Sequence, residues 1–79
     1  MVIVYAIWSE RFNRIYVGMS QDIEKRLKEH NAGMTQSTKA FRPWKIIFTA
    51  TFENWKKGRA AEKYYKTGTG KEFLKNLVP

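Results

Sequence analysis

The chain has 79 residues and no cysteine, so disulfide bonds and thiolate chemistry are excluded, and a reducing cytoplasm is the expected location. Fifteen lysines and arginines face seven acidic residues, which gives a formal net charge of +8 at pH 7. Such a surface attracts polyanions, most commonly nucleic acid, although charge alone also fits a merely soluble basic protein. We expect one small domain over residues 1–79.

The first two predicted elements form a β-hairpin. The apolar run at residues 2–8 is too short to span a membrane, and no basic segment precedes it as in a signal peptide, so we interpret it as a core strand. A second β-like stretch, residues 14–19, follows the polar loop 9–12. With that loop, paired residue numbers sum to 21, which places Tyr5 opposite Tyr16 with both rings on one face.

A basic helix is predicted next. Ser20 is the expected N-cap and Asp22 falls in the first turn, while the helix is expected to reach Asn31 and stop at Gly33. The polar residues 32–41 predict an exposed loop.

This helix carries the only histidine of the chain. Ile23 and Leu27 form its core-facing stripe, and Arg26 and His30 flank that stripe one helical turn apart. A single histidine is more often structural or solvated than catalytic, and strand tyrosines are usually packing residues. The spacing alone leaves both interpretations open.

The second half of the chain predicts a strand and two helices. The strand has period-2 alternation, with one buried face formed by Trp44, Ile46, Phe48, Ala50 and Phe52. The next helix, capped by Asn54, is expected to reach about Lys66, with an inner line of Trp55, Gly58, Glu62 and Tyr65. Gly68 ends it, and residues 69–72 have the form of a capping box for the last helix. The prediction is an α+β fold: a small three-stranded antiparallel or mixed sheet flanked by helices, in the order β-β-α-β-α-α.

Glu62 is a carboxylate on the apolar side of its helix, where an unpaired charge is costly. Two interpretations fit this position. Glu62 forms a salt bridge with Arg59, Lys63 or Lys66, or it is a ligand for Mg²⁺, a hard cation that accepts one or two carboxylates.

Several chemistries lack the residues they need. The chain has no glycine-rich phosphate loop, no Cys/His metal pattern and no serine placed for nucleophilic catalysis. A basic surface, an inward carboxylate, an arginine, a histidine and paired tyrosines remain, which is adequate equipment for phosphodiester hydrolysis.

These residues resemble the GIY-YIG endonuclease superfamily over nearly the whole chain, most closely its small single-domain members similar to the nuclease domain of the excision-repair protein UvrC. The second family motif stands as Tyr16-Val17-Gly18, and the first keeps only its tyrosine in Val4-Tyr5-Ala6. Ten residues after the motif tyrosine comes the arginine of the helix 22–31, with the histidine four later. Further matches are Thr38-Lys39, Arg42-Pro43-Trp44, Glu62-Lys63 and residues 66–74.

The resemblance implies a role for each residue. Tyr16 would be the general base as a phenolate, Arg26 would neutralise the transition state, and Glu62 would hold a single Mg²⁺ or Mn²⁺ ion. Tyr5 and His30 would complete the pocket. Met19 stands where the UvrC-like branch has a lysine, and His30 is the expected substitute for that cation.

We therefore predict a metal-dependent endonuclease that cleaves DNA, in a structure-specific way suited to DNA repair or processing, with RNA left open as a substrate. Selectivity would come from branched or damaged DNA or from a partner protein that delivers it. Expected backbone contacts are Lys39, Arg42, Lys45, Lys56 and Lys57. The alternatives are a nucleic-acid-binding module of the same fold with weak or no catalysis, and a protein-interaction adaptor.

Overall fold

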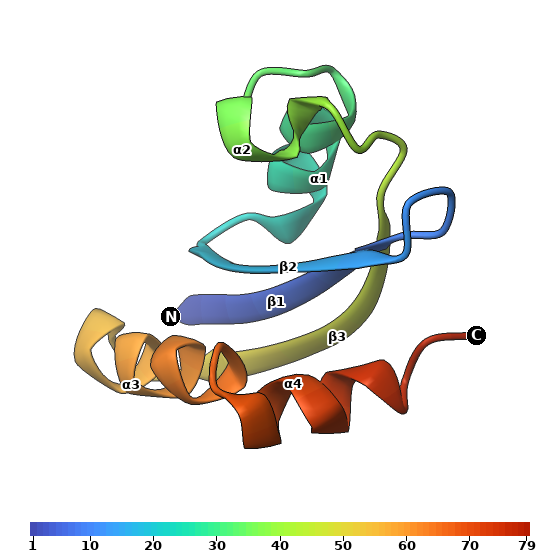
Figure 1. The fold of residues 1–79 in the computed structure, drawn as a ribbon. Helices are drawn as coiled ribbons and strands as arrows, with labels where there is room; N and C mark the ends of the chain where they lie inside the picture. The colour runs from blue at the N-terminus through green and yellow to red at the C-terminus, as the bar shows by residue number, and fades with distance from the viewer.

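A computed structural model describes all residues from 1 to 79. Its centre is an antiparallel sheet of order β2-β1-β3, formed by β1 (Val2–Ser9), β2 (Arg14–Ser20) and β3 (Lys45–Phe52). One side of the sheet is covered by α1 (Ile23–Asn31) and α2 (Gln36–Lys39), and the other by α3 (Trp55–Tyr65) and α4 (Gly68–Lys75) (Figure 1). The predicted α+β class and the order of the main elements are confirmed. The short α2 is an addition within the segment predicted as an exposed loop.

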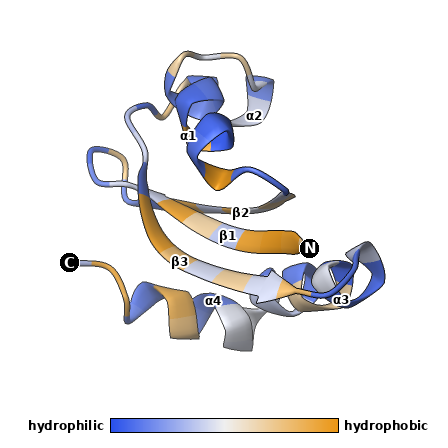
Figure 2. Ribbon diagram, turned by 180° about the vertical axis from the view of Figure 1, so that it is seen from behind, coloured by the Kyte–Doolittle hydropathy of each residue, from blue (hydrophilic) through white to orange (hydrophobic).

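The central strand β1 supplies core residues to both sides of the sheet, and Figure 2 shows its largely hydrophobic course. On the α3 and α4 side, the buried cluster is entirely apolar and consists of Val4, Ala6, Val17 and Leu74. On the α1 side, the buried cluster is formed by Tyr5, Ile7 and Trp44, with Ile23 and Leu27 of α1 packed against it. The predicted core stripe of α1 is therefore confirmed.

The register of the β-hairpin differs from the prediction by two residues. Tyr5 is paired with Gly18, and Ile7 is paired with Tyr16. The turn has the expected four residues but lies one residue further along the chain, at residues 10–13, where Asn13 adopts a left-handed conformation (φ 52°), which asparagine tolerates, and accepts a hydrogen bond from the Trp8 indole. A shift of two residues preserves the faces of a strand, so Tyr5 and Tyr16 still share one side.

The prediction that β3 buries a single face from Trp44 to Phe52 is wrong for the first half of the strand. Ala6 pairs with Phe48 but Ile7 pairs with Ile46, so Ile47 is an extra residue in the ladder. A bulge of this kind reverses the alternation on either side of it. Trp44 is consequently buried on the α1 side, whereas Phe48 packs on the α3 side and Ile46 is exposed.

Two of the predicted helix caps also need correction. The side chain of Asp22, and not that of Ser20, caps α1 by accepting from the Lys25 amide. Thr67, and not Thr69, caps α4. The predicted cap Asn54 is confirmed by its bond from the Lys57 amide. None of the helices has the length and apolar character needed to cross a membrane.

Candidate active site

Gly18 makes room for the tyrosine pair on the α1 side of the sheet. A Cβ atom at this position would lie 2.6 Å from the Tyr5 hydroxyl oxygen and 3.1 Å from Cε2 of Tyr16. No real side chain tolerates the first of these distances. The glycine therefore lets the Tyr5 ring extend across β2, with its centroid 6.5 Å from that of Tyr16. The structure therefore gives Gly18 a role in positioning Tyr5.

His30 lies fully buried between two hydroxyl groups. Its Nε2 atom is 2.8 Å from the Tyr5 hydroxyl, and its Nδ1 atom is 2.7 Å from Oγ1 of Thr38. The Thr38 hydroxyl donates its single proton to the Thr35 carbonyl, so it accepts from Nδ1–H. Nε2 is then the unprotonated nitrogen and accepts from the Tyr5 O–H. The network runs in one direction, from Tyr5 through His30 and Thr38 to the backbone.

The electrostatics keep this network neutral. Burial is the main cause that lowers the pKa of His30, and the nearby Arg26 charge lowers it further. Burial raises the pKa of the Tyr5 phenol, although the adjacent Arg26 guanidinium opposes that shift. The lowered pKa of His30 disfavours the cation that would replace the lysine absent at Met19, and the substitution of His30 for that lysine stays a prediction.

Arg26 reaches the same pocket from α1 while remaining accessible. The Tyr5 hydroxyl is the main group that raises the pKa of Arg26, which shows how close the two side chains lie. The Nη1 atom of Arg26 also forms a 3.2 Å salt bridge with Glu29 one turn along the helix. The side chain is still 37% exposed, so part of its donor set is free to receive an anion.

Tyr16 differs from Tyr5 in its access to solvent. Tyr5 is 1% exposed, whereas Tyr16 is only half-buried. Its ring packs edge-on to His30 at 5.2 Å and to Trp44 at 6.5 Å between centroids. None of the side-chain hydrogen bonds of the fold uses the Tyr16 hydroxyl. Of the two tyrosines, Tyr16 is the one that can meet water or a ligand.

Glu62 approaches the tyrosines from the other side of the sheet. At Gly58, one turn earlier on α3, a Cβ would lie 2.7 Å from Val2, so the helix sits close against the strands. Glu62 is largely buried, and its negative charge contributes to the raised pKa of Tyr5. Its oxygen lies 3.4 Å from the more exposed Lys66 ammonium. The salt bridge anticipated from the sequence is thus present, and its partner is Lys66.

The acidic residues near this pocket fit one kind of metal site. No group of three or more His, Cys, Asp or Glu side chains gathers to form a cage made only of protein ligands. Mg²⁺ commonly binds through one or two carboxylates together with water and substrate phosphate oxygens. Glu62, whose only partner is a lysine on an exposed stem, suits a cation that arrives with a phosphate.

The predicted site residues thus converge from different elements. Tyr5, Tyr16 and His30 are in mutual contact, Arg26 borders them, and the charge of Glu62 reaches Tyr5. They do not all line one hollow. The nearest hollow is an open groove of about 380 Å³ whose walls include Ser20, Asp22, Lys25, Arg26, Glu29 and Trp55, and we refer to it as the α1–α3 groove.

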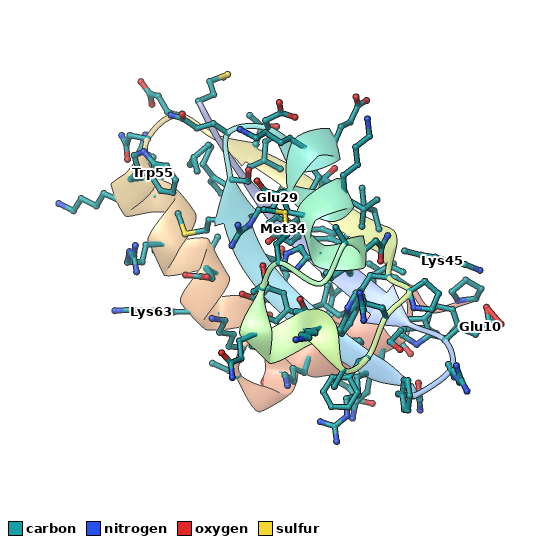
Figure 3. All side chains as sticks on the ribbon, turned by 90° about the horizontal axis from the view of Figure 1, so that it is seen from above. Glu10, Glu29, Met34, Lys45, Trp55 and Lys63 are labelled. Carbon is teal, nitrogen blue, oxygen red and sulfur yellow. The ribbon has the colours of Figure 1, made fainter.

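The predicted DNA-contacting residues occupy separate places. Lys39 and Arg42 line a hollow beside α2, whereas Lys56 and Lys57 lie at the start of α3. Lys45 is paired with Glu10 at 3.1 Å, at the end of the molecule opposite Trp55 (Figure 3). Lys57 is paired with Glu53 at 2.8 Å. Another hollow, of about 630 Å³, was not predicted and is lined by basic residues including Arg14, Lys71 and Lys75.

Thr38 and Trp55 have roles that the sequence patterns did not predict. Thr38 was assigned to an exposed loop but is fully buried against His30, and its carbonyl accepts from the Trp44 indole. The signal in the sequence that singled out Thr38 was the match of Thr38-Lys39 to the resembled family. Trp55 was expected on the inner line of its helix but is 49% exposed. Its stripe extends past the edge of the sheet at the start of α3.

The fold and this cluster define a small α+β domain with two tyrosines, an arginine and a histidine on one side of an antiparallel sheet. The model of the GIY-YIG catalytic domain matches residues 1–76, and the chain belongs to the GIY-YIG family. Membership of this family implies nuclease-type chemistry in general.

Within this family, the chain is similar to several UPF0213 proteins. The chain is 38% identical over 61 residues to the UPF0213 protein YazA of Bacillus subtilis, which covers 76% of this chain and 62% of YazA. A UPF0213 protein of Clostridium perfringens is 33% identical over 61 residues, covering 76% of this chain and 66% of the relative. The chain therefore spans less than two thirds of these relatives. The solution NMR structure of the UPF0213 protein BH0048 from Bacillus halodurans matches with a TM-score of 0.57 and 25% identity, covering 98% of this chain and 85% of that one.

Proposed function

We propose that the protein is a metal-dependent endonuclease that hydrolyses phosphodiester bonds in DNA, acting on branched or otherwise structured substrates. The observation that carries this proposal is the convergence of Tyr16, Arg26 and the Tyr5–His30 pair on one side of the sheet, within reach of the Glu62 charge. The net charge of +8 adds a general attraction to nucleic acid.

Tyr16 and Arg26 act directly on the substrate. Tyr16 acts as the base in its phenolate form, and the phenolate oxygen takes a proton from the attacking water. Arg26 binds a non-bridging phosphate oxygen and neutralises the negative charge that grows in the transition state. The same guanidinium lies beside the Tyr5 hydroxyl. Glu29 holds the arginine from behind at 3.2 Å.

Tyr5 and His30 form the rigid wall of the pocket. Both are buried, and their hydrogen bonds to each other and to Thr38 hold the imidazole in one tautomer. This imidazole packs against the Tyr16 ring at an interplanar angle of 61° and helps to fix the orientation of that ring. Thr38 acts through His30 and is therefore a positioning residue.

Glu62 is the residue that would hold the divalent ion. A bound Mg²⁺ or Mn²⁺ supplies Lewis-acid stabilisation of the leaving oxygen. The weak, solvent-accessible pairing with Lys66 leaves the carboxylate available for this purpose. In this mechanism the base Tyr16 and Arg26 act from one side of β2, and the carboxylate of Glu62 acts from the other.

The test is cleavage of a labelled flap DNA by the purified chain in the presence of Mg²⁺ or Mn²⁺. Tyr16→Phe and Glu62→Gln should each reduce the single-turnover rate by about 100-fold or more. Tyr64→Phe and Glu72→Gln are the matched controls, because both side chains are exposed on the surface, and they should cleave like the wild type. Circular dichroism of each variant verifies that it is folded.

Two results would contradict the proposal. Cleavage that persists in both site variants would place the reaction elsewhere or in a contaminant. Salt-dependent binding of DNA by the wild type without cleavage in either metal would instead establish the alternative, a binding module of the same fold.

A further inference from the structure

We propose that the α1–α3 groove is a binding subsite for one unpaired nucleobase, which stacks on Trp55 a few nucleotides from the phosphate held by Arg26. This inference rests on the proposed function in taking DNA as the substrate, and it adds a subsite that selects unpaired nucleotides. The observations that support the subsite are the shape of the groove, the charges of the groove and the position of Trp55 on α3.

The groove has the dimensions and lining of a site for a flat ring. Its volume of about 380 Å³ is at the lower end of the range for small-ligand pockets, about 300–1,000 Å³. Met19 and Ser20 of β2 line it together with residues of α1, and Trp55 is its only aromatic residue. Figure 3 shows Trp55 at the start of α3, across β2 from Glu29 on α1. Every base offers a π-face, so an indole exposed in a groove is a sequence-tolerant stacking platform.

The charges of the groove match a nucleotide and not an apolar peptide. Lys25 and Arg26 line it as cations. The carboxylates on the same walls are engaged within the protein, since Asp22 caps α1 and Glu29 is paired with Arg26. Lys56 follows Trp55 directly and is exposed. An aromatic surface bordered by cations is the arrangement that binds single-stranded nucleic acid.

The position of Trp55 on α3 explains why the bound base must be unpaired. Trp55 and Glu62 are seven residues apart on one stripe of the helix, which corresponds to about 10 Å along the axis. Stacked nucleotides of one strand cover that distance in about three steps. A base inside a continuous duplex has both faces covered by its neighbours and has none to offer to Trp55. The subsite therefore favours a flap, a gap or a frayed end close to the cut.

The exposure of Trp55 provides a direct optical test. Trp8 and Trp44 are 6% and 4% exposed, whereas Trp55 is 49% exposed, so a stacked base quenches mainly Trp55. The protein is titrated with a short single-stranded oligonucleotide in EDTA, where cleavage cannot interfere. We expect saturable quenching, with little or none from an oligonucleotide of the same length whose sugars carry no bases. A long duplex with few ends should quench weakly.

Variants supply a second readout, by fluorescence anisotropy of the labelled strand. Trp55→Ala should weaken single-strand binding by about tenfold, and Trp55→Phe should restore much of it, because a phenyl ring also stacks. Tyr64→Ala removes another exposed aromatic of α3 and should bind like the wild type. Equal quenching by the base-free oligonucleotide, or unchanged affinity of Trp55→Ala, would overturn the proposal.

The EDTA format separates this inference from the proposed nuclease function. Base-dependent quenching without cleavage under any metal would support the subsite and refute the nuclease. Cleavage that is equally fast for paired and flapped DNA, with no quenching, would support the nuclease and refute the subsite.

Discussion

The two sides of the central sheet are built by different principles. Beneath α3 and α4, Val4, Ala6, Val17 and Leu74 form a buried cluster without a polar atom in its side chains. Beneath α1, Tyr5, His30 and Thr38 bury three polar side chains in a single chain of hydrogen bonds. Both clusters draw on the same strand, β1, so alternation along eight residues separates them.

The difference distinguishes the side of the sheet that mainly stabilises the fold from the side that carries the candidate active site. An apolar cluster stabilises the fold in proportion to the surface that it buries. Burying a polar group costs free energy unless each donor and acceptor is satisfied, and a small domain has little stability to spare. A buried polar network in a chain of 79 residues must therefore be complete merely to avoid this cost, which apolar side chains do not incur. It is better explained by the geometry it maintains around Tyr16 and Arg26.

The largest expected effect separates the two sides by function. Arg26→Lys keeps a positive charge but loses the planar, multidentate donor set, and we expect DNA cleavage to slow by about 100-fold or more. Because the side chain is partly exposed, the free energy of unfolding should change by less than about 1 kcal/mol. Single-turnover kinetics and urea denaturation of the same preparation measure both quantities. A large loss of stability with normal cleavage would reverse the assignment.

The matching change on the apolar side is Leu74→Ala. Leu74 is 0% exposed, and truncation of such a leucine costs about 2–5 kcal/mol through lost burial and the cavity left behind. Denaturation should show this loss, while the cleavage rate per folded molecule should stay within about twofold of the wild type. A slower rate at full folding would mean that α4 is coupled to the polar side.

Thr38→Val sharpens the comparison within the polar side. Valine has the shape of threonine but cannot accept from His30 Nδ1–H, so we expect a destabilisation of about 1–3 kcal/mol. Thr38→Ser keeps the hydroxyl and should recover most of the loss. A steric role for Thr38 predicts the opposite order, with valine tolerated and serine impaired.

The smallest expected effect is a dependence of stability on pH. The pKa of His30 in the folded protein is lowered from about 6.5, so the unfolded chain takes up a proton more readily as the pH falls. The free energy of unfolding should decrease progressively below about pH 6.5 and level off above it. Urea denaturation between pH 5 and 7.5 measures the slope, and His30→Gln should flatten it. A slope of opposite sign would mean that His30 is stabilised as a cation.

Patterns of local chemistry predicted most of the fold correctly. The α+β class, the order of the main elements and the core stripe of Ile23 and Leu27 follow from periodicity and are confirmed. Errors arose where one residue changed the phase or the cap. The hairpin turn lies one residue further along the chain and includes Asn13, Ile47 introduced a bulge into β3, and Thr67 capped α4 ahead of Thr69.

The candidate site was predicted less completely than the fold. The spacing of Arg26 and His30, with the motif Tyr16-Val17-Gly18, pointed to side chains that the structure brings together. Burial of Tyr5 and His30, and the neutrality that follows from it, depends on tertiary packing of α2 against α1. Trp55 acquires its surroundings from segments distant in sequence, and Thr38 is buried by the packing of α2 against α1, so strand and helix periodicity could assign neither residue. The cytoplasmic location and the predicted backbone contacts of Lys39, Arg42, Lys45, Lys56 and Lys57 stay predictions.

The most direct test of the contrast between the two sides is the protonation of the His30 ring. Nitrogen-15 NMR of the histidine-labelled protein at pH 7 reports each ring nitrogen separately, and His30 is the only histidine. The network predicts a neutral imidazole with its proton on Nδ1, facing Thr38, and an unprotonated Nε2 facing Tyr5. A proton on Nε2, or on both nitrogens, would contradict the arrangement on which the proposed active site depends.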